Sequence, residues 1–404
     1  MYADDLALFS HSEEQLQSNM NILNEFCIKW NLQINSKKTK TMVFNRGNKL
    51  CKTNIFINKT LINCVKEFKY LGFTISAKNC NFLSTIKDLK TKADRAIFAL
   101  NSKIKLSRLP SNLALKVFNS QIKPILLYGA EVWAPYTMYN YDNWDSSETE
   151  KCHTQFLKRI MGCDIHSPNL MIRAEFGINP LLTDIICRSI SFLKHLVINN
   201  TSLSYQSLSY ELNNTDENNL LRLIRLYKPE TINSTENFSK YKINKECKER
   251  YQLIWDSKIK ELPKAISYNL FKSSSNLEKY ITVIPNRKHK IALGRLRVSS
   301  HSLMIEKGRH SRPKIEREER YCPYCVNVVE DECHFITNCP LYNVSRTELD
   351  QEIRKTCLYY HEMTDMQKFI FVMSNENSSI IKKLAKYVFN SMEKRKEFLN
   401  SDTR

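Results

Sequence analysis

The amino-acid sequence predicts a predominantly α-helical α+β fold built from more than one unit. Only 7 glycines occur in 404 residues, so few positions are free to adopt positive φ, which favours helices over turns. Apolar residues alternate over short segments of residues 1–78, whereas from residue 84 onward they recur every three or four positions, as on one face of a helix. The length exceeds that of a typical single domain.

The first unit, residues 1–78, combines one helix with short extended segments. Tyr2–Ser10 is predicted to be the second arm of a hairpin whose turn carries two aspartates, and residues 13–30 have helical apolar spacing at Leu16, Met20, Leu23, Phe26 and Trp30. Extended segments are predicted from alternating apolar residues at 32–35, 40–44, 55–57 and 68–75. We therefore expect a small α+β unit at this end of the chain.

The remainder of the chain is predicted to be mostly helical. Residues 84–198 form a helical domain that begins with an apolar stripe including Ile86, Leu89 and Ala93. The segments that follow are a polar linker or loop (199–219), a helical connector with a basic segment (220–300), a cysteine-containing region (301–345) and a C-terminal helical region (346–404). The basic residues beside the first stripe are Lys87, Lys90, Lys92 and Arg95.

The charge balance favours a polyanionic partner. Sixty-one Lys and Arg against 42 Asp and Glu give a formal charge of +19, which attracts nucleic acid; the alternative is a charge that serves solubility alone. The sequence contains no apolar run of the roughly 20 residues that span a bilayer, and we expect no membrane partner. Thirteen cysteines without a secretory signal fit reduced thiols, which predicts an intracellular protein of the cytoplasm, the nucleus or both.

Four potential metal ligands lie close together near the C-terminus. Cys322 and Cys325 form a two-residue knuckle, and His334 and Cys339 complete a C-x2-C-x8-H-x4-C pattern. Three cysteines and a histidine suit a tetrahedral Zn²⁺ ion, and a closed set of four ligands predicts a structural rather than a catalytic metal. Cys333 could compete with its neighbour His334, and the alternative reading is a chance cluster of reduced cysteines.

The acidic pair Asp4-Asp5 gains meaning from the motifs that follow it. Two adjacent aspartates alone are equally compatible with a solvated turn. Here they stand in Tyr2-Ala3-Asp4-Asp5, and the later segments are Trp30–Asn35 with Lys38-Thr39-Lys40, Met42-Val43-Phe44, Phe68–Gly72, Leu126–Trp133 and Leu157–Gly162. In this order they resemble the palm and thumb motifs of reverse transcriptases from LINE-type non-LTR retrotransposons. The resemblance extends with varying strength over essentially the whole chain, and the cysteine region resembles the zinc-knuckle-like region of the same elements.

The resemblance implies a truncated polymerase palm, a helical thumb and a small zinc-binding region, with an RNA template and a DNA primer or target DNA as partners. It assigns a catalytic Mg²⁺ ligand to Asp4, an auxiliary role to Asp5, and an interaction with the leaving pyrophosphate to Lys38, which is otherwise a solvated loop lysine. Tyr2 and Ala3 would lie near the primer end and the incoming nucleotide. The primer terminus would contact Tyr70, Leu71 and Gly72, which otherwise form an ordinary β-turn.

The same resemblance places nucleic-acid contacts on two basic segments. Lys87, Lys90, Lys92 and Arg95 would face the template–primer duplex. A second group would contact RNA or target DNA, although a solvated basic face explains it equally well; this group is Arg287, Lys288, Lys290, Arg295 and Arg297.

The sequence departs from the family in what precedes the acidic pair. The family's other metal-binding aspartate, its fingers and its endonuclease lie upstream of these residues, so Mg²⁺ binding would need a complementing carboxylate. We therefore expect the polypeptide alone to lack polymerase activity. The rival reading is a non-catalytic, zinc-containing RNA- or DNA-binding protein derived from the element, and a third is the product of a decayed element.

Overall fold

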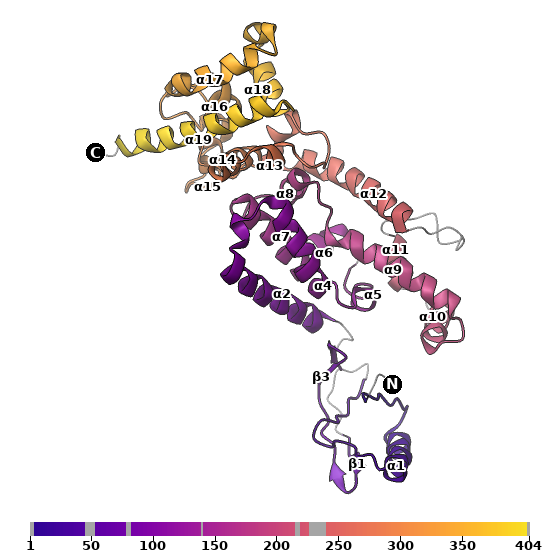
Figure 1. Ribbon diagram of the computed structural model, residues 1–404. Coiled ribbons are helices and arrows are strands. Elements are labelled where there is room, and N and C mark those ends of the chain that lie inside the picture. The colour runs from indigo at the N-terminus through magenta and orange to yellow at the C-terminus, as the bar shows by residue number, and fades with distance from the viewer. Residues whose placement is uncertain are drawn as a thin grey trace.

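The computed structural model describes residues 4–44, 53–77, 82–138, 140–214, 219–225 and 240–401. Over these residues the chain is predominantly helical and contains two small antiparallel sheets, which confirms the predicted fold class. Figure 1 shows an N-terminal unit at one end, a central group of helices, and a C-terminal group ending in the long helix α19. Tyr2 and Ala3 lie outside the described residues.

The N-terminal unit has a small apolar core of its own. Helix α1 (Glu13–Lys29) begins at Ser12, whose side chain accepts a hydrogen bond from the backbone N–H of Gln15. The side chain of Gln17 then bonds to both backbone groups of Phe56, at 2.8 and 2.9 Å, and so holds α1 against strand β1 (Phe56–Ile57). Strand β1 pairs with β2 (Thr60–Leu61). The core residues are Met20, Ile55, Ile57 and Ile62.

Two of the extended segments expected in this unit are not strands. Residues 6–10 and 32–35 have no strand pairing, and the segment 40–44 contributes an isolated bridge between Thr41 and Cys64. Phe9 and Leu32 are exposed. Because a strand is stabilised by a hydrogen-bonded neighbour and a buried face, alternation alone does not produce one at these positions.

A tight hairpin connects the N-terminal unit to the helical part. Strands β3 (Glu67–Tyr70) and β4 (Phe73–Ser76) pair antiparallel, with Tyr70 opposite Phe73. The two residues between them, Leu71 and Gly72, both have positive φ, at 47° and 85°, as a two-residue type I′ turn requires. In Figure 1 this hairpin lies between the N-terminal unit and helix α2.

Helix α2 (Leu83–Ile104) begins the helical part and buries the apolar stripe expected from the sequence, including Ile86, Leu89 and Ala93. The chain then bends through a 3₁₀ turn (Leu106–Arg108) and a π-helical segment (Phe118–Ile122) ahead of Pro124. The other helices of this part are α3 (Ser111–Val117), α4 (Lys123–Leu126), α5 (Ala130–Trp133), α6 (Tyr141–Asp145), α7 (Glu148–Met161), α8 (Asn169–Phe176) and α9 (Leu181–Ile198).

The polar stretch 199–219, expected to be a linker or loop, contains a helix. Residues Leu203–Asn214 form α10, which packs against α9 and buries Leu208. Most side chains of this helix are polar because much of its surface faces solvent. Tyr210 and Leu212 are also exposed. Helix α11 (Asn219–Arg225) also packs on α9, as does α12 (Lys240–Glu261).

The C-terminal helices pack on the central group through one continuous apolar core that extends from Ile86 to Val388. Helix α14 (Arg287–Arg297) and helix α17 (Asn343–Arg354) both lie against α19 (Ser378–Ser401). The remaining helices are α13 (Tyr280–Val283), α15 (Met304–His310), α16 (Glu332–Thr337) and α18 (Asp365–Met373). No helix in the described ranges is both long and apolar enough to cross a bilayer.

Candidate functional site

The acidic pair lies on the surface of the N-terminal unit. Asp4 and Asp5 are both exposed. Among the described residues, the one group of three or more metal-ligating side chains within reach of a common ion is the cysteine cluster, which does not include either aspartate. The part of the chain described here therefore brings no third ligand to the acidic pair.

Lys38 is positioned by an asparagine-closed turn. The side chain of Asn35 accepts a hydrogen bond from the backbone N–H of Lys38 at 3.1 Å, and its carbonyl accepts another from the backbone N–H of Thr39 at 2.9 Å. Asparagine closes such turns because its side-chain oxygen substitutes for a backbone carbonyl. The Asn-x-x-Lys-Thr spacing therefore forms a turn, and Lys38 is exposed on it.

The Tyr70-Leu71-Gly72 turn contacts a second glycine motif far along the chain. The Tyr128 hydroxyl donates a hydrogen bond of 2.8 Å to the Leu71 carbonyl, and a Cβ on Gly72 would lie 3.0 Å from the Tyr128 ring. Gly129, with φ of 58°, faces Phe73 so closely that a Cβ there would overlap the ring. The structure thus brings together two segments that the sequence identified separately.

The four candidate zinc ligands converge in the C-terminal region. The ligand atoms of Cys322, Cys325, His334 and Cys339 all lie within 4.8 Å of one another. The sulfur of Cys339 is 3.9 Å from that of Cys322 and 3.8 Å from that of Cys325. Distances of this size between sulfurs are compatible with thiolates at about 2.3 Å from one shared tetrahedral ion.

Local structure explains why these side chains meet. The backbone N–H of Val326 bonds to the carbonyl of Cys322, and Val326 adopts a φ of 61°, so the chain turns sharply and both knuckle cysteines point the same way. Asp331 caps helix α16 by accepting a hydrogen bond of 2.8 Å from the backbone N–H of His334. The cap fixes the helix that presents the imidazole to the cysteines.

The cluster has the electrostatic and hydrogen-bonding character of a metal site. Both ring nitrogens of His334 are buried without a hydrogen-bond partner among the described residues, an arrangement that is costly unless something binds them. The hydrogen bond between the sulfurs of Cys322 and Cys339 is the main cause that lowers the pKa of Cys322, to about 3, and the same contact raises the pKa of Cys339. A group of Cys and His side chains that could hold a metal is therefore present.

The basic residues differ in how accessible they are. Lys87, Lys92 and Arg95 are exposed on α2, whereas Lys90 is engaged by Asp94 at 2.9 Å and lies 4.0 Å from Glu148. On α14, the exposed side chains are Arg287, Lys288 and Arg295, and Lys290 is partly buried.

Arg297 does not belong to this surface. Its guanidinium is buried and bonds to both carboxylate oxygens of Glu175, to Glu278 and to the carbonyl of Met373. Arg297 was expected to contact nucleic acid, but the structure buries its guanidinium and uses its donors inside the protein. A run of basic residues cannot reveal an acidic partner 122 positions away.

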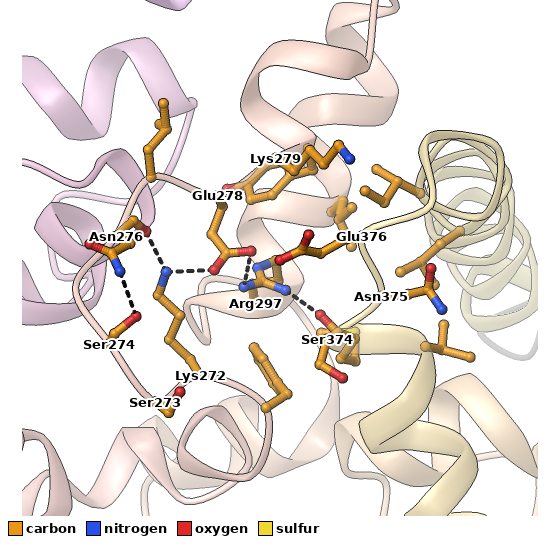
Figure 2. Close-up of a pocket in the computed structure, with 18 of the residues that line it drawn as sticks. Lys272, Ser273, Ser274, Asn276, Glu278, Lys279, Arg297, Ser374, Asn375 and Glu376 are labelled. Atoms are coloured by element: carbon orange, nitrogen blue, oxygen red, sulfur yellow. Dashed lines mark hydrogen bonds and ion pairs between the residues drawn. The ribbon is translucent and has the colours of Figure 1, made fainter.

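Arg297 also borders a cavity of about 580 Å³ between the 272–280 segment and the turn that precedes α19. Figure 2 shows Lys272 bonded to the Asn276 carbonyl and to Glu278, which also meets Arg297. Within this cavity the buried cations are thus neutralised by carboxylates of the protein itself. Arg297 on α14 thus joins Glu175 on α8 to the Met373 carbonyl at the end of α18.

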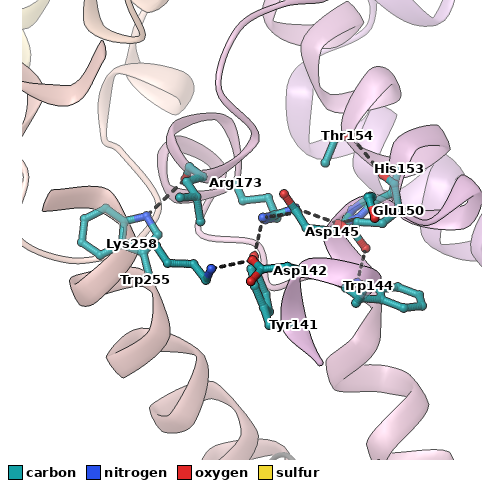
Figure 3. Close-up of polar contacts among 12 residues, drawn as sticks. Tyr141, Asp142, Trp144, Asp145, Glu150, His153, Thr154, Arg173, Trp255 and Lys258 are labelled. Atoms are coloured by element: carbon teal, nitrogen blue, oxygen red, sulfur yellow. Dashed lines mark hydrogen bonds and ion pairs between the residues drawn. The ribbon is translucent and has the colours of Figure 1, made fainter. Parts of the chain in front are cut away.

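A second buried network, centred on Arg173, was not identified from the sequence. Arg173 bonds to Glu150, Asp145, Tyr141 and Tyr251, from three other helices, as Figure 3 shows in part. Glu150 also accepts hydrogen bonds from Trp144, His153 and the backbone of Leu181. The available signal was a pair of charged residues, Arg173 and Glu175, inside the otherwise apolar run Leu170–Phe176. The network is structural, because both Arg173 and Glu150 are fully buried.

Comparisons with known proteins point to one family. Residues 1–75 match the family described as reverse transcriptase (RNA-dependent DNA polymerase). A curated relative, the RNA-directed DNA polymerase from mobile element jockey of Drosophila funebris, is 27% identical over 142 residues, which amount to 33% of this chain and 15% of the relative. The chain therefore spans a small part of the relative's length, and no solved structure matches it. This chain is accordingly related to the reverse transcriptases of LINE-type mobile elements, with the family's sequence in its first 75 residues.

Proposed function

We propose that this chain is a nucleic-acid-holding part of a LINE-type RNA-directed DNA polymerase and that its C-terminal region is organised by a structural zinc ion. The observation that carries the proposal is the acidic pair, Asp4-Asp5, inside the residues that match the reverse transcriptase family. RNA template and DNA primer or target DNA are the partners this role implies. In the complete enzyme, Asp4 would hold Mg²⁺, Asp5 would support it, and Lys38 would act on the leaving pyrophosphate.

By itself the 404-residue polypeptide does not polymerise DNA under this proposal. Two-metal phosphoryl transfer needs several carboxylates that hold two ions about 3.5 to 4 Å apart. The exposed position of Asp4 and Asp5, without a third ligand among the described residues, supports this conclusion.

The zinc proposal rests on the fit between the four side chains and the ion. Three sulfurs and one imidazole within 4.8 Å match a closed tetrahedral set, and the ion would satisfy both the clustered thiols and the buried imidazole of His334. With all four positions filled by protein, the zinc supplies cross-linking and no reaction chemistry. It joins the knuckle at Cys322 to helix α16 and to the turn at Cys339.

Nucleic-acid binding is assigned to the exposed basic side chains of α2 and α14. Each Lys or Arg that neutralises a phosphate releases a counterion, so binding weakens as salt rises. The accessible positions on α2 are Lys87, Lys92 and Arg95; those on α14 are Arg287, Lys288 and Arg295.

A primer-extension assay tests the catalytic part of the proposal. Purified protein is incubated with primed poly(rA), Mg²⁺ and dTTP, and we expect no extension above background. Processive extension that is abolished in Asp4→Asn but retained in Asp88→Asn, a change to a partly exposed aspartate on α2 that pairs with Lys69, would contradict the proposal. Fluorescence anisotropy with labelled RNA measures binding in parallel, and a salt-independent affinity would contradict phosphate contacts.

A second candidate function is a non-catalytic zinc-containing RNA- or DNA-binding protein. The observation that favours it is the separation of the core spanning Ile86 to Val388 from the small cluster around Met20, since the helical part builds its interior without the acidic pair. A chimera that joins the upstream polymerase segments of the jockey relative to residue 1 distinguishes the two. DNA synthesis that depends on Asp4 supports the polymerase role, and its absence in a folded, RNA-binding chimera supports the second.

A further inference from the structure

A second cavity, of about 260 Å³, lies where the central helices meet α13 and α14. Its walls come from the 3₁₀ turn at Leu106–Arg108, the start of α3 and the segment that joins α13 to α14. Apolar side chains of three helices form much of its lining, among them Met161, Phe176 and Ile281. This cavity is smaller than the roughly 300 to 1,000 Å³ of drug-sized sites and suits one compact, flat group.

Every charged residue that lines this cavity is a cation. The three are Arg108, Arg287 and Lys290, and no carboxylate lines the cavity. This composition differs from the larger cavity in Figure 2, where Glu278 neutralises Lys272 and Arg297. Arg108 and Arg287 are exposed and Lys290 is partly buried, so an anion that entered the cavity would meet three positive charges that no carboxylate of the lining offsets.

Two of the three cations are oriented by hydrogen bonds and still have donors to offer. Arg287 donates through Nε to the Ser107 carbonyl at 2.8 Å, and Lys290 donates to the Ile281 carbonyl at 2.7 Å. A guanidinium has five N–H donors and an ammonium three, so most remain available. Burial lowers the pKa of Lys290, as expected for a cation with little compensation from carboxylates.

An anion attached to a flat, weakly polar ring matches both properties. We propose that this cavity receives one nucleotide of a single-stranded RNA or DNA, with its base against the apolar lining and its phosphate on Arg108, Arg287 and Lys290. The proposal rests on the nucleic-acid binding proposed above and adds a site for an unstacked base. A base within a duplex stays stacked, so the ligand must be single-stranded.

The surroundings of the cavity favour a continuous polyanion over an isolated one. Lys103 and Lys105 precede the 3₁₀ turn, and Lys288 stands beside Arg287 on α14; all three are exposed. Phosphates on either side of the bound nucleotide would meet these lysines. An acyl chain with an anionic head also combines apolar and charged parts. Its long chain does not match the small volume of the cavity, and its single head group would not reach the flanking lysines.

The charge contribution is tested with salt titrations of the full chain. Fluorescence anisotropy with labelled 12-nucleotide single-stranded RNA and DNA gives the dissociation constant at several salt concentrations. We expect the slope of log affinity against log salt to fall by about one in Arg108→Gln and in Arg287→Gln. Lys248→Gln removes an exposed lysine from α12, which does not line the cavity, and should leave affinity and slope as in the wild type.

The base contribution needs a variant that keeps every charge. Ser111 begins α3 at the lining of the cavity and is partly exposed, so Ser111→Trp fills the space with little demand on the core. We expect about tenfold weaker binding of both oligonucleotides, as for the loss of one base-stacking contact, and no change of salt slope. Ser111→Ala is the matched control. Inorganic polyphosphate, which has no bases, should compete equally for wild type and Ser111→Trp.

The outcomes separate this proposal from the one on which it rests. If the wild type binds neither oligonucleotide, the proposed nucleic-acid function fails. If the wild type binds both, the variants Arg108→Gln, Arg287→Gln and Ser111→Trp decide the cavity proposal. Wild-type affinity, salt slope and melting temperature in all three would overturn it and leave nucleic-acid binding in place. Displacement of a 12-mer from the wild type by oleate, with Ser111→Trp insensitive to oleate, would overturn it in favour of a lipid.

Discussion

Replacing Arg173 should destabilise the helical part far more than replacing any surface cation. Arg173 is fully buried, and its guanidinium contacts Glu150 at 3.0 Å and Asp145 at 2.7 Å. Arg173→Met retains much of the side-chain volume but leaves Glu150 as a buried carboxylate without its cation. Breaking a buried ion pair from one side costs about 3–5 kcal/mol, and we expect a loss of stability in this range.

The expected loss lies toward the lower end because Glu150 keeps other donors. Trp144, His153 and the backbone of Leu181 continue to hydrogen-bond to its carboxylate at 2.9 to 3.1 Å. Lys396→Met is the matched control, since Lys396 pairs with Glu393 on the exposed surface of α19. Such surface pairs contribute about 0–1 kcal/mol.

Urea unfolding followed by tryptophan fluorescence measures both variants. Trp144 donates to Glu150 and Trp255 donates to the Leu170 carbonyl, so two of the four tryptophans report on this region. A cost for Arg173→Met below about 1 kcal/mol, equal to that of Lys396→Met, would refute the reasoning that the buried charges depend on each other. In the Glu150→Gln background the cost of Arg173→Met should be smaller, because the fully buried carboxylate is then absent and only the partly exposed Asp145 loses its cation.

Three further predictions concern the metal cluster, the interlocked glycine and an acidic side chain. Purified protein should contain one zinc per chain by elemental analysis, and Cys322→Ser should lower the metal content and the melting temperature, whereas Cys333→Ser should change neither; equal zinc in both variants would exclude the assigned ligands. Gly129→Ala should cost more than about 1 kcal/mol in thermal unfolding, since the position combines positive φ with overlap on Phe73; an unchanged melting temperature would contradict the close packing. Burial raises the pKa of Glu332, but hydrogen bonds from His301 and Ser267 lower it overall, so its contribution to stability is present above the unfolded value of about 4.3 and is lost as pH falls through the lower folded pKa. Glu332→Gln should therefore make the acid limb of a stability-versus-pH curve shallower, and an unchanged limb would show that this carboxylate is not coupled to folding.

The sequence predicted those elements whose defining residues lie close together along the chain. The apolar stripe of α2 is buried as its spacing predicted, because a helix with one apolar face buries that face. The cysteine and histidine spacing likewise predicted a group that the structure brings together. In both cases the information lies within a few turns of chain.

Features that depend on distant residues could not be found in this way. Arg297 looked like a surface cation because the basic run around it is local, whereas Glu175, its partner, lies on another helix. Residues 203–214 were predicted to be a loop because most of their side chains are polar. They form a helix whose few apolar side chains pack against α9, which the local sequence does not show. The cavity at Arg108 combines residues from five segments, so no single stretch of sequence indicates it.

The contact between the β3–β4 hairpin and the Tyr128-Gly129 segment has a consequence for how such proteins can be recombined. Phe73 is the hairpin residue that packs on the large core, and the turn before it is tied to Tyr128. A crossover that exchanges the first 65 residues for those of another element keeps the hairpin and the Tyr128-Gly129 segment from the same parent. A crossover between residues 77 and 126 places the hairpin and the Tyr128-Gly129 segment in different parents. The chimera then keeps this contact only if Gly72 still fits Tyr128 and Gly129 still fits Phe73.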